Sequence, residues 1–356
     1  MENIGIITLY GNTNYGNRLQ NLAVQTILED YGFRTESIVF VSSRFKWRTF
    51  PLRKHMRGIF LKDSGSLRKY RLEKFNRRYI KTRYIYGQDD HLPSKLVSEY
   101  DFFVTGSDQV WNVRMKEVIR KDWFYFLEFA EDAKKVCISP SIGASLHTVP
   151  EESLERMRRL LSGFRNLCCR EKQGAQEISD LTGRMCEWLI DPTLYISPER
   201  WKKILSLKSS GRVPYVFLFF LDGISKELRD YIGAYAASGG YEIIDPSDPG
   251  SRFYGIDPAD FVSFISGAHM VFTDSFHATA FCVNFQVPFY VFDRNLVQNM
   301  SSRIQSVCEV FGLKDRYIRE QKPFEIREDC SFEAADGQLA AERRKLSGYL
   351  DRCFGK

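Results

Sequence analysis

Residues 272–281 read Phe-Thr-Asp-Ser-Phe-His-Ala-Thr-Ala-Phe, and this stretch decides which fold we expect for the chain of 356 residues. The run 269–273 is short and apolar, as in a buried strand, and residues 277–285 repeat apolar side chains at helical spacing. Asp274 and Ser275 are residue types that cap helix starts. The stretch therefore predicts a strand, a tight polar turn and a helix, with His277 in the first helical turn. Backbone N–H groups and the positive end of the helix dipole make such a turn suitable for an anion.

Polar residues also follow the other predicted strands. The runs 4–10, 100–105, 135–139 and 167–169 are apolar, and each ends in a polar or glycine-containing turn. Helical spacing follows the first turn up to residue 31, and a second strand is predicted over 37–41. This β-loop-α-β order predicts a doubly wound α/β domain, in which ligands bind beyond the carboxyl ends of the strands. The first loop lacks the GxGxxG pattern, so a dinucleotide site has little support.

The length of the chain favours two domains. We expect an N-terminal Rossmann-like domain over residues 1–197 and a C-terminal one over 212–325, separated by a polar linker around 206–211. A charged helical tail is predicted over 326–356. Two such α/β domains facing each other across a cleft would bring the polar turns together, and converging polar groups are the default hypothesis for a ligand site.

Positive charge is concentrated in residues 44–83. This segment holds fifteen Lys or Arg residues against two carboxylates and so carries +13, whereas the whole chain carries +6 and the remainder carries −7. Aromatic and aliphatic residues are interleaved with the charges. Such a basic segment suits an anionic membrane surface, a diphosphate-bearing lipid or nucleic acid. The alternative is a solvated helical excursion from the N-terminal domain.

The eight cysteines form no CxxC pair, so neither a zinc site nor a disulfide framework is predicted. No apolar run approaches transmembrane length, and the first residues do not resemble a signal peptide. We therefore expect a cytoplasmic protein whose thiols are reduced and buried as small hydrophobic side chains. No ligand pattern suggests a metal, and no cofactor is expected.

Five motifs together resemble the polysaccharide pyruvyl transferase family. They occur in the family's order, and the resemblance covers roughly residues 1–295, outside the basic segment and the tail. The shared order makes the set more specific than any one motif. The motifs are Asn14–Gln20, Gly106–Asn112, Arg170–Lys172, Asp191–Thr193 and Thr273–Phe281.

The resemblance implies a fold like that of GT-B glycosyltransferases, with two Rossmann-like domains and the site between them. It implies a transferase that moves pyruvate from phosphoenolpyruvate onto two hydroxyls of one sugar, which gives a cyclic ketal in a surface polysaccharide such as a capsule or exopolysaccharide. The acceptor would be a glycan or lipid-linked oligosaccharide at the inner face of the cell membrane. The basic segment 44–83 would then make a peripheral contact with anionic membrane, and no nucleic acid partner is expected.

The resemblance also implies roles for residues of this chain. Ketal formation needs an acid for C3 of the donor, a base for the hydroxyls and cations near the phosphate. The implied catalytic residues are His277, Asp108 and Arg170. The implied donor-binding residues are Arg170, Ser275, His277, Ser141 and Gly143. The implied acceptor-binding residues are Asn14, Tyr15, Asn17, Gln20, Asp108 and Trp111.

One position departs from the family pattern. Many members carry an arginine two residues before the histidine, where this chain has Ser275. Phosphoenolpyruvate is multiply anionic, so we expect Arg170 and the helix start to carry more of the donor binding. The helix start should lower the pKa of His277, and a bound phosphate should raise it again. His277 is therefore expected to become an acid in the donor complex.

Structural roles compete with several of these assignments. His277 could simply cap the turn, Arg170 could pair with a carboxylate, and Asp108 could cap the following helix. Trp111 could fill the core instead of stacking on a sugar. Asp191, Pro192 and Thr193 are interpreted as a structural, extended strand exit.

Two other functions would use a similar fold. One is a GT-B glycosyltransferase that uses a nucleotide sugar, and the other is a non-catalytic module that binds glycans or anionic surfaces.

Overall fold

The computed structural model describes residues 1–10, 14–42, 64–87, 94–115, 118, 123–207, 213–294 and 301–356. The chain divides into two compact units. Unit 1 comprises Met1–Lys54, Glu73–Tyr195 and Glu342–Lys356, and unit 2 comprises His55–Leu72 and Ile196–Ala341. The division falls inside helices α3 (Ser64–Tyr79) and α14 (Glu333–Phe354), so each of these helices contributes residues to both units.

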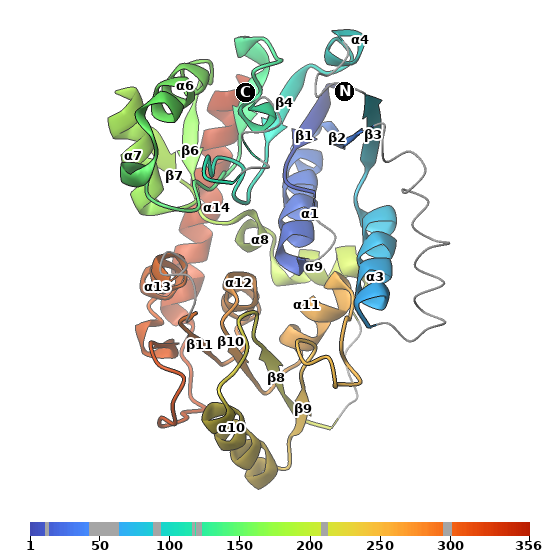
Figure 1. Cartoon of the computed structure of the whole chain (residues 1–356), viewed down its shortest axis with the longest axis vertical. Helices are drawn as coiled ribbons and strands as arrows, with labels where there is room; N and C mark the ends of the chain where they lie inside the picture. The colour runs from blue at the N-terminus through green and yellow to red at the C-terminus, as the bar shows by residue number, and fades with distance from the viewer. Residues whose placement is uncertain are drawn as a thin grey trace. The chain divides into compact units, whose positions relative to one another are not determined.

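Unit 1 contains a five-stranded sheet with the strand order β3-β2-β1-β4-β5 and a two-stranded sheet of β6 and β7 (Figure 1). Every pairing in both sheets is parallel. The strands are β1 (Asn3–Ile7), β2 (Arg34–Ser42), β3 (Thr82–Gly87), β4 (Phe102–Thr105), β5 (Lys135–Cys137), β6 (Leu167–Cys169) and β7 (Cys186–Trp188). The α-helices are α1 (Tyr15–Asp30), α4 (Ser94–Val97), α6 (Glu151–Ser162), α7 (Lys172–Thr182) and α8 (Pro192–Tyr195), with parts of α3 and α14.

Unit 2 is organised in the same way around a five-stranded parallel sheet, with the order β12-β11-β10-β8-β9. The central strand, β10, is fully buried, as expected when helices cover both faces of a parallel sheet. The strands are β8 (Tyr215–Phe219), β9 (Glu242–Ile244), β10 (Met270–Thr273), β11 (Phe289–Phe292) and β12 (Tyr317–Ile318). The helices are α9 (Pro198–Leu205), α10 (Lys226–Gly239), α11 (Pro258–Ser266), α12 (Phe276–Phe285) and α13 (Ser301–Val310).

The predicted α/β class is confirmed, because both units are built on parallel sheets connected through helices. The predicted strand, turn and helix around residues 272–281 are present as β10 and α12. The side chain of Ser275 caps α12 by accepting a hydrogen bond from the backbone N–H of Ala278 at 3.4 Å. Asp274, predicted as a second capping residue, instead accepts backbone hydrogen bonds from the turn after β8.

The extended strand exit predicted at Asp191, Pro192 and Thr193 is wrong, because β7 ends at Trp188 and α8 begins at Pro192. The carboxylate of Asp191 accepts a hydrogen bond from the backbone N–H of Thr193 at 3.0 Å, as a capping side chain does. Proline is favoured in the first turn of a helix, so this Asp-Pro pair starts a helix here instead of ending a strand.

The tail is helical from Glu333 to Phe354, whereas the prediction began at residue 326, and the two halves of the helix belong to different units. In unit 1 the hydroxyl of Tyr349 donates a hydrogen bond to the carbonyl oxygen of Cys137 at 3.0 Å. The ring centroids of Phe354 and Phe33 are 4.5 Å apart. In unit 2 the carboxylate of Asp336 accepts a hydrogen bond from the side chain of Gln286 at 2.6 Å. The last helix is therefore part of both compact units.

Residues 43–63 of the basic segment, and residues 208–212 of the predicted linker, lie outside the described residues. Residues 64–79 of the basic segment form helix α3 and residues 82–87 form β3, an edge strand of the unit 1 sheet. At least this part of the segment is thus integrated into the folded units.

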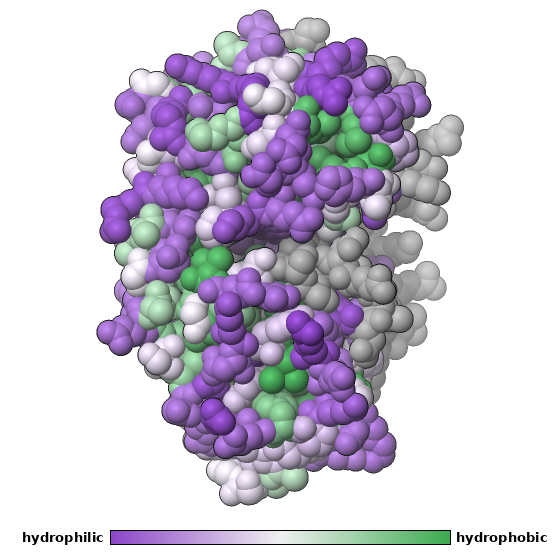
Figure 2. Space-filling model, turned by 90° about the vertical axis from the view of Figure 1, so that its left-hand side faces the viewer, coloured by the Kyte–Doolittle hydropathy of each residue, from purple (hydrophilic) through white to green (hydrophobic). Residues whose placement is uncertain are grey.

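Within the described residues, no helix is long and apolar enough to cross a membrane. On the face drawn in Figure 2, hydrophilic side chains predominate and hydrophobic ones form small separate groups. All eight cysteines are free thiols, and each of them is buried except Cys330, which is half-buried.

Candidate functional site

The polar turns after the strands lie at the carboxyl edge of each sheet, because all strands of a parallel sheet end at the same edge. In unit 1 this edge collects residues from the turns after β1, β4 and β5 of the five-stranded sheet. The turn after β6, a strand of the two-stranded sheet, joins them because the backbone N–H of Arg170 donates to the carbonyl oxygen of Pro140 at 2.9 Å. In unit 2 it collects residues from the turns after β8, β10 and β11. Each edge is described by itself below.

Asp108 follows β4 and is the half-buried carboxylate of the unit 1 edge. Its Oδ2 accepts a hydrogen bond from Nδ2 of Asn17 at 2.6 Å, and its Oδ1 accepts one from the backbone N–H of Gln109 at 2.8 Å. The backbone of Asp108 has φ of 79°, in the left-handed region that non-glycine residues rarely adopt. Its carbonyl oxygen accepts a hydrogen bond from the N–H of Ser141 at 2.8 Å. Neighbouring elements thus hold this carboxylate in an uncommon backbone conformation.

The start of α1 supplies the predicted acceptor-binding residues Asn14, Tyr15, Asn17 and Gln20. Asn14 is exposed and caps the helix by accepting a hydrogen bond from the N–H of Asn17 at 3.3 Å. Gln20 is fully buried, and its Nε2 donates to the hydroxyl of Thr8 at 3.0 Å. Tyr15 is buried as well. Asn17 is therefore the member of this group that contacts Asp108, whereas Gln20 fixes the end of β1.

Ser141 and Gly143 follow β5. The hydroxyl of Ser141 donates to Oε1 of Glu171 at 2.5 Å and accepts a hydrogen bond from the N–H of Gly143 at 3.1 Å. Gly143 has φ of +70°, and a Cβ atom there would lie 2.3 Å from Nδ2 of Asn112. Only glycine fits this backbone conformation and this close approach.

Trp111 is fully buried among aromatic rings. Its ring stacks on Phe126, with centroids 5.8 Å apart, and meets the edge of Phe164 at 5.7 Å. Trp111 therefore packs in the core, which was the alternative to stacking on a sugar.

Arg170 follows β6 and is buried, with 3% of its side chain exposed. Its Nη1 donates to Oδ2 of Asp191 at 2.9 Å, and its Nε lies 3.6 Å from Oε1 of Glu171. Burial lowers the pKa of the guanidinium, but the two carboxylates outweigh burial and raise the pKa above its ordinary value. Arg170 thus pairs with neighbouring carboxylates, which was the structural alternative to donor binding.

In unit 2, Asp274 ties two strand ends together. Its two carboxylate oxygens accept hydrogen bonds from the backbone N–H groups of Leu221 at 2.7 Å and Asp222 at 2.9 Å. Burial raises the pKa of Asp274, and these N–H groups oppose the shift. Next to it, the half-buried His277 is the second residue of α12, and its ring meets the edge of Phe276 at a centroid distance of 5.2 Å. The hydrogen bonds of Asp274 therefore hold the start of α12 against the turn after β8.

Arg294 is a residue of this edge that the sequence analysis missed. It follows β11, and its Nε donates to the backbone carbonyl oxygen of Asp274 at 3.1 Å and lies 3.9 Å from Oδ2 of the same residue. Its side chain is 12% exposed. A guanidinium thus lies beside the turn that begins α12. Arg294 lies two residues after the end of β11 and in none of the five motifs, so no sequence signal pointed to it.

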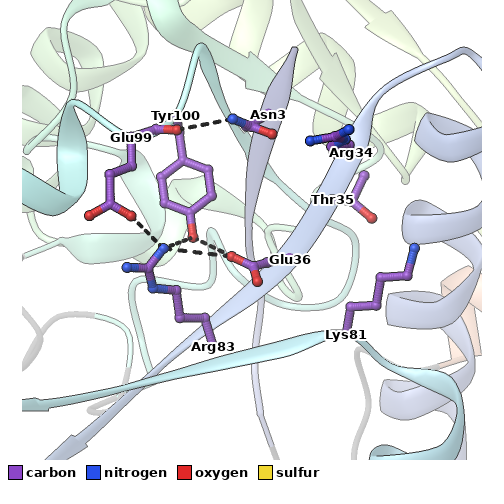
Figure 3. A pocket seen from close by; sticks show the side chains of 8 residues that line it. All are labelled: Asn3, Arg34, Thr35, Glu36, Lys81, Arg83, Glu99 and Tyr100. Atoms are coloured by element: carbon purple, nitrogen blue, oxygen red, sulfur yellow. Dashed lines mark hydrogen bonds and ion pairs between the residues drawn. The ribbon is translucent and has the colours of Figure 1, made fainter. Parts of the chain in front are cut away.

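A concavity of about 700 Å³ lies at the opposite, amino edge of the unit 1 sheet (Figure 3). Its charged side chains are largely paired with one another. Nη1 of Arg83 lies 2.7 Å from Oε2 of Glu99, and the hydroxyl of Tyr100 donates to Oε2 of Glu36 at 2.8 Å. The described residues contain no group of three or more His, Cys, Asp or Glu side chains that could hold a metal ion.

Comparison with known proteins gives a family and a fold. A family model for polysaccharide pyruvyl transferase matches residues 14–295. Among curated proteins, none matches the sequence significantly.

Several solved structures are similar in fold. The UDP-GlcNAc 2-epimerase from Neisseria meningitidis, solved bound to UDP-GlcNAc, has a TM-score of 0.51 at 11% identity, over 99% of this chain and 100% of that chain. A putative UDP-N-acetylglucosamine 2-epimerase from Listeria monocytogenes has a TM-score of 0.47 at 11% identity, over 99% and 97% of the two chains. At such identities the similarity shows the fold alone. The Neisseria structure supports the predicted GT-B-like fold, which is confirmed.

Proposed function

The chain belongs to the polysaccharide pyruvyl transferase family, and from this premise we propose that it moves pyruvate from phosphoenolpyruvate onto a sugar of a polysaccharide precursor. The observation that carries the proposal is the family match over residues 14–295, which includes the polar turns at the carboxyl edges of both sheets. The product is a cyclic ketal of the sugar, and the second product is inorganic phosphate.

The reaction balances without an external oxidant or reductant. A proton is added to C3 of phosphoenolpyruvate, which becomes a methyl group, while one sugar hydroxyl oxygen forms a bond to C2. A second hydroxyl oxygen of the same sugar then bonds to C2, and the bond from C2 to the phosphate oxygen breaks. Of the two hydroxyl protons, one balances the proton added to C3 and the other leaves with phosphate. The enzyme must therefore supply a base, an acid and positive charge near the phosphate.

Asp108 is the proposed base for the acceptor hydroxyl. Its carboxylate is half-buried and held from two sides by Asn17 and by the backbone of Gln109, so its position is fixed before the acceptor arrives. The neighbouring Asn14 and Tyr15 belong to the proposed acceptor side. An oriented carboxylate that contacts the sugar hydroxyl would lower the barrier for attack on C2.

His277 is the proposed acid and a donor ligand. It lies in the first turn of α12, where backbone N–H groups and the helix dipole favour an anion. A bound phosphate or carboxylate of the donor would favour the protonated imidazole. Finding in an NMR titration that phosphoenolpyruvate leaves the His277 ring unchanged would remove this role.

Arg294 is the residue that we add to the proposed donor side. Its guanidinium is anchored through Nε on Asp274, beside the same turn. Ser275 has no charge, and a guanidinium that contacts the donor offers charge-assisted hydrogen bonds to a phosphate or carboxylate. Ser141, Gly143 and Arg170 remain proposed donor contacts from unit 1. For Arg170 the ion pairs with Asp191 and Glu171 favour an indirect role, in which it shapes the edge.

The acceptor is proposed to be lipid-linked, with the basic segment 44–83 holding the enzyme at an anionic membrane surface. Helix α3 contributes exposed cations to this segment, among them Lys69, Lys74 and Arg78. The triple variant Lys69→Glu, Lys74→Glu, Arg78→Glu should bind vesicles containing phosphatidylglycerol less tightly than the unchanged protein in a sedimentation assay. Equal binding would dismiss the membrane role and leave the transfer reaction untouched.

The test of the function is product formation with defined donors. Purified protein is incubated with phosphoenolpyruvate and a panel of glycan acceptors, and phosphate release and the new ketal methyl signal are followed by NMR. Equal yields of phosphate and ketal are expected. Nucleotide release from a UDP-sugar with the same acceptors, and no phosphate from phosphoenolpyruvate, would show the nucleotide-sugar glycosyltransferase instead.

A further inference from the structure

Arg18 is an unusual residue of the unit 1 edge, because its charged side chain is fully buried. It lies in the first turn of α1, and its Cζ lies 4.3 Å from the ring centroid of Tyr10. Within the described residues, no carboxylate forms a salt bridge with it and its Nη1 has no hydrogen-bond partner. Burying a guanidinium without a paired carboxylate costs several kcal/mol in general, so a function is the natural explanation.

The neighbours of Arg18 connect it to Asp108. Nη2 of Arg18 donates to the carbonyl oxygen of Leu9 at 2.5 Å, and Nε donates to Oδ1 of Asn17 at 2.9 Å. The other end of the same amide, Nδ2 of Asn17, donates to Oδ2 of Asp108 at 2.6 Å. A guanidinium only donates and a carboxylate only accepts, so the Asn17 amide satisfies both only in this orientation.

We infer that Arg18 is a positioning residue that acts through Asn17 to orient the Asp108 carboxylate. Because Arg18 has no exposed surface, it acts on the reaction through another group and does not contact substrate. Asp108 is half-buried, so its carboxylate can contact substrate. The inference rests on the proposed role of Asp108 as the base.

Burial lowers the pKa of the Arg18 guanidinium to about 10, and Tyr10, Asp108, Tyr84 and Glu73 oppose this shift. The guanidinium therefore carries its charge in an assay at neutral pH. Arg170, after β6, is a second guanidinium whose charge interacts with Asp108.

Three variants test the connection. Arg18→Met removes the donors to Asn17, so kcat should fall at least about tenfold, whereas KM for phosphoenolpyruvate should change little because Arg18 does not contact substrate. Arg18→Lys keeps a buried donor and should recover part of the lost kcat. Asn17→Ala breaks the connection at its centre, so kcat should fall as it does in Arg18→Met.

Arg316 provides a matched control in unit 2. It is also a buried arginine over a tyrosine ring, 5.0 Å from the centroid of Tyr290, and its Nη1 donates to the carbonyl oxygen of Arg327 at 2.8 Å. Arg316→Met should destabilise the fold and leave kcat near that of the unchanged enzyme. A fall in kcat equal to that in Arg18→Met would mean that general destabilisation explains both.

The NMR signals of the Asn17 side-chain amide and of the Asp108 carboxyl carbon test the connection without catalysis. In Arg18→Met both signals should move from their positions in the unchanged protein, and in Arg316→Met they should not. Unmoved signals in Arg18→Met would overturn the inference, even if the enzyme forms ketal. If no pyruvyl transfer occurs but the signals move, the proposed function fails and the connection stands. Should Arg18→Met not fold, Asn17→Ala decides: an unchanged kcat contradicts the inference.

Discussion

The two edges of the unit 1 sheet hold charged side chains in opposite ways. At the carboxyl edge Arg170 pairs with Asp191, and 3% and 0% of the two side chains are exposed. At the amino edge Arg83 pairs with Glu99 at 2.7 Å, and 37% and 40% are exposed. The carboxyl edge also holds two non-glycine residues in the left-handed region, Asp108 and Ser139, with φ of 79° and 48°.

This difference teaches that cavity size alone is a poor guide to the site. The amino edge has the concavity of about 700 Å³, but its ion pairs are exposed and screened by water (Figure 3). At the carboxyl edge the same kinds of groups lie in low dielectric, where interactions are stronger and broken pairs cost more. Strained, non-glycine backbone at that edge is typical of functional sites. The comparison predicts large effects of substitutions there and small ones at the amino edge.

The largest effect is expected for Asp108→Asn. Loss of the base should lower kcat/KM for pyruvyl transfer by about 10²–10⁴-fold, because asparagine cannot take the hydroxyl proton. The thermal unfolding temperature should change little, since the side chain is half-buried and keeps its shape. The rate of phosphate release from phosphoenolpyruvate with acceptor measures the effect.

Glu99→Gln at the amino edge is the matched carboxylate-to-amide control. It should leave the rate of phosphate release within twofold of the unchanged enzyme, or about 0.4 kcal/mol in barrier. Similar losses in both variants would contradict the distinction between the two edges.

The second effect is on stability. Arg170→Met leaves Asp191 buried without its cation, and breaking such a pair costs about 3–5 kcal/mol. Urea unfolding of Arg170→Met, Asp191→Asn and the double variant should show that the double variant is more stable than the sum of the single losses predicts. Additive losses would mean that the two residues do not act as a pair.

Much of the fold followed from local patterns in the sequence. Buried parallel strands are continuous apolar runs, and β10 and β4 were predicted within two residues of their observed ends. The edge strand β3 was not predicted; its first two residues, Thr82 and Arg83, belong to the basic segment. The halves of α14 were predicted as one tail, because nothing in a helical pattern tells which compact unit each half joins.

The sequence predicted that the polar residues after the strands lie together, but it did not predict which of them contact one another. Asp108 and Ser141 follow neighbouring strands of one parallel sheet, whereas Arg170 follows β6 of the two-stranded sheet. The ion pair between Arg170 and Asp191 and the hydrogen bonds from Arg18 to Asp108 through Asn17 depend on side-chain packing across several strands. Arg294 lay at the end of the matched region and in no motif, so only its hydrogen bond to Asp274 identified it. Which residues contact substrate remains a prediction.

A third prediction asks whether the carboxyl edge of the unit 2 sheet behaves like that of unit 1. Burial raises the pKa of Asp274 above 3.8, its ordinary value, so folding favours the protonated carboxyl. The resulting stability is fully present below about pH 3.8 and is lost as the pH rises through the folded pKa. The free energy of unfolding of the protein relative to Asp274→Asn should therefore decline from acidic to neutral pH. The free energy of unfolding should fall by about 1.4 kcal/mol for each tenfold increase in the proton affinity of this carboxyl on folding.

Urea unfolding of both proteins at several pH values measures this difference. The loss of one accepted N–H bond in Asp274→Asn adds a constant offset, so the slope with pH carries the information. A slope of the opposite sign would show that the hydrogen bonds from Leu221 and Asp222 outweigh burial.

The smallest effect is expected at the amino edge. Arg83→Gln removes an exposed ion pair with Glu99, which is worth about 0.2–1 kcal/mol in free energy of unfolding. The hydrogen bond to Glu99 raises the pKa of Arg83 above its ordinary value, so Arg83 stays charged at neutral pH. The loss of stability should therefore not depend on pH between about 6 and 9, the range in which mainly histidine and cysteine titrate. It should shrink in about 1 M salt, where the Debye length is about 3 Å.

Arg34→Gln in the same concavity is the control for that variant, since Arg34 forms no ion pair with the residues that the structure describes. The difference between Arg83→Gln and Arg34→Gln at low salt reports the ion pairs of Arg83 with Glu99 at 2.7 Å and Glu36 at 3.8 Å. A loss of unfolding free energy above about 2 kcal/mol, or one that persists in high salt, would mean that the ion pairs of the amino edge are shielded from water as those of the carboxyl edge are. The physical distinction between the two edges would then be wrong, and the concavity would become the stronger candidate for a ligand site.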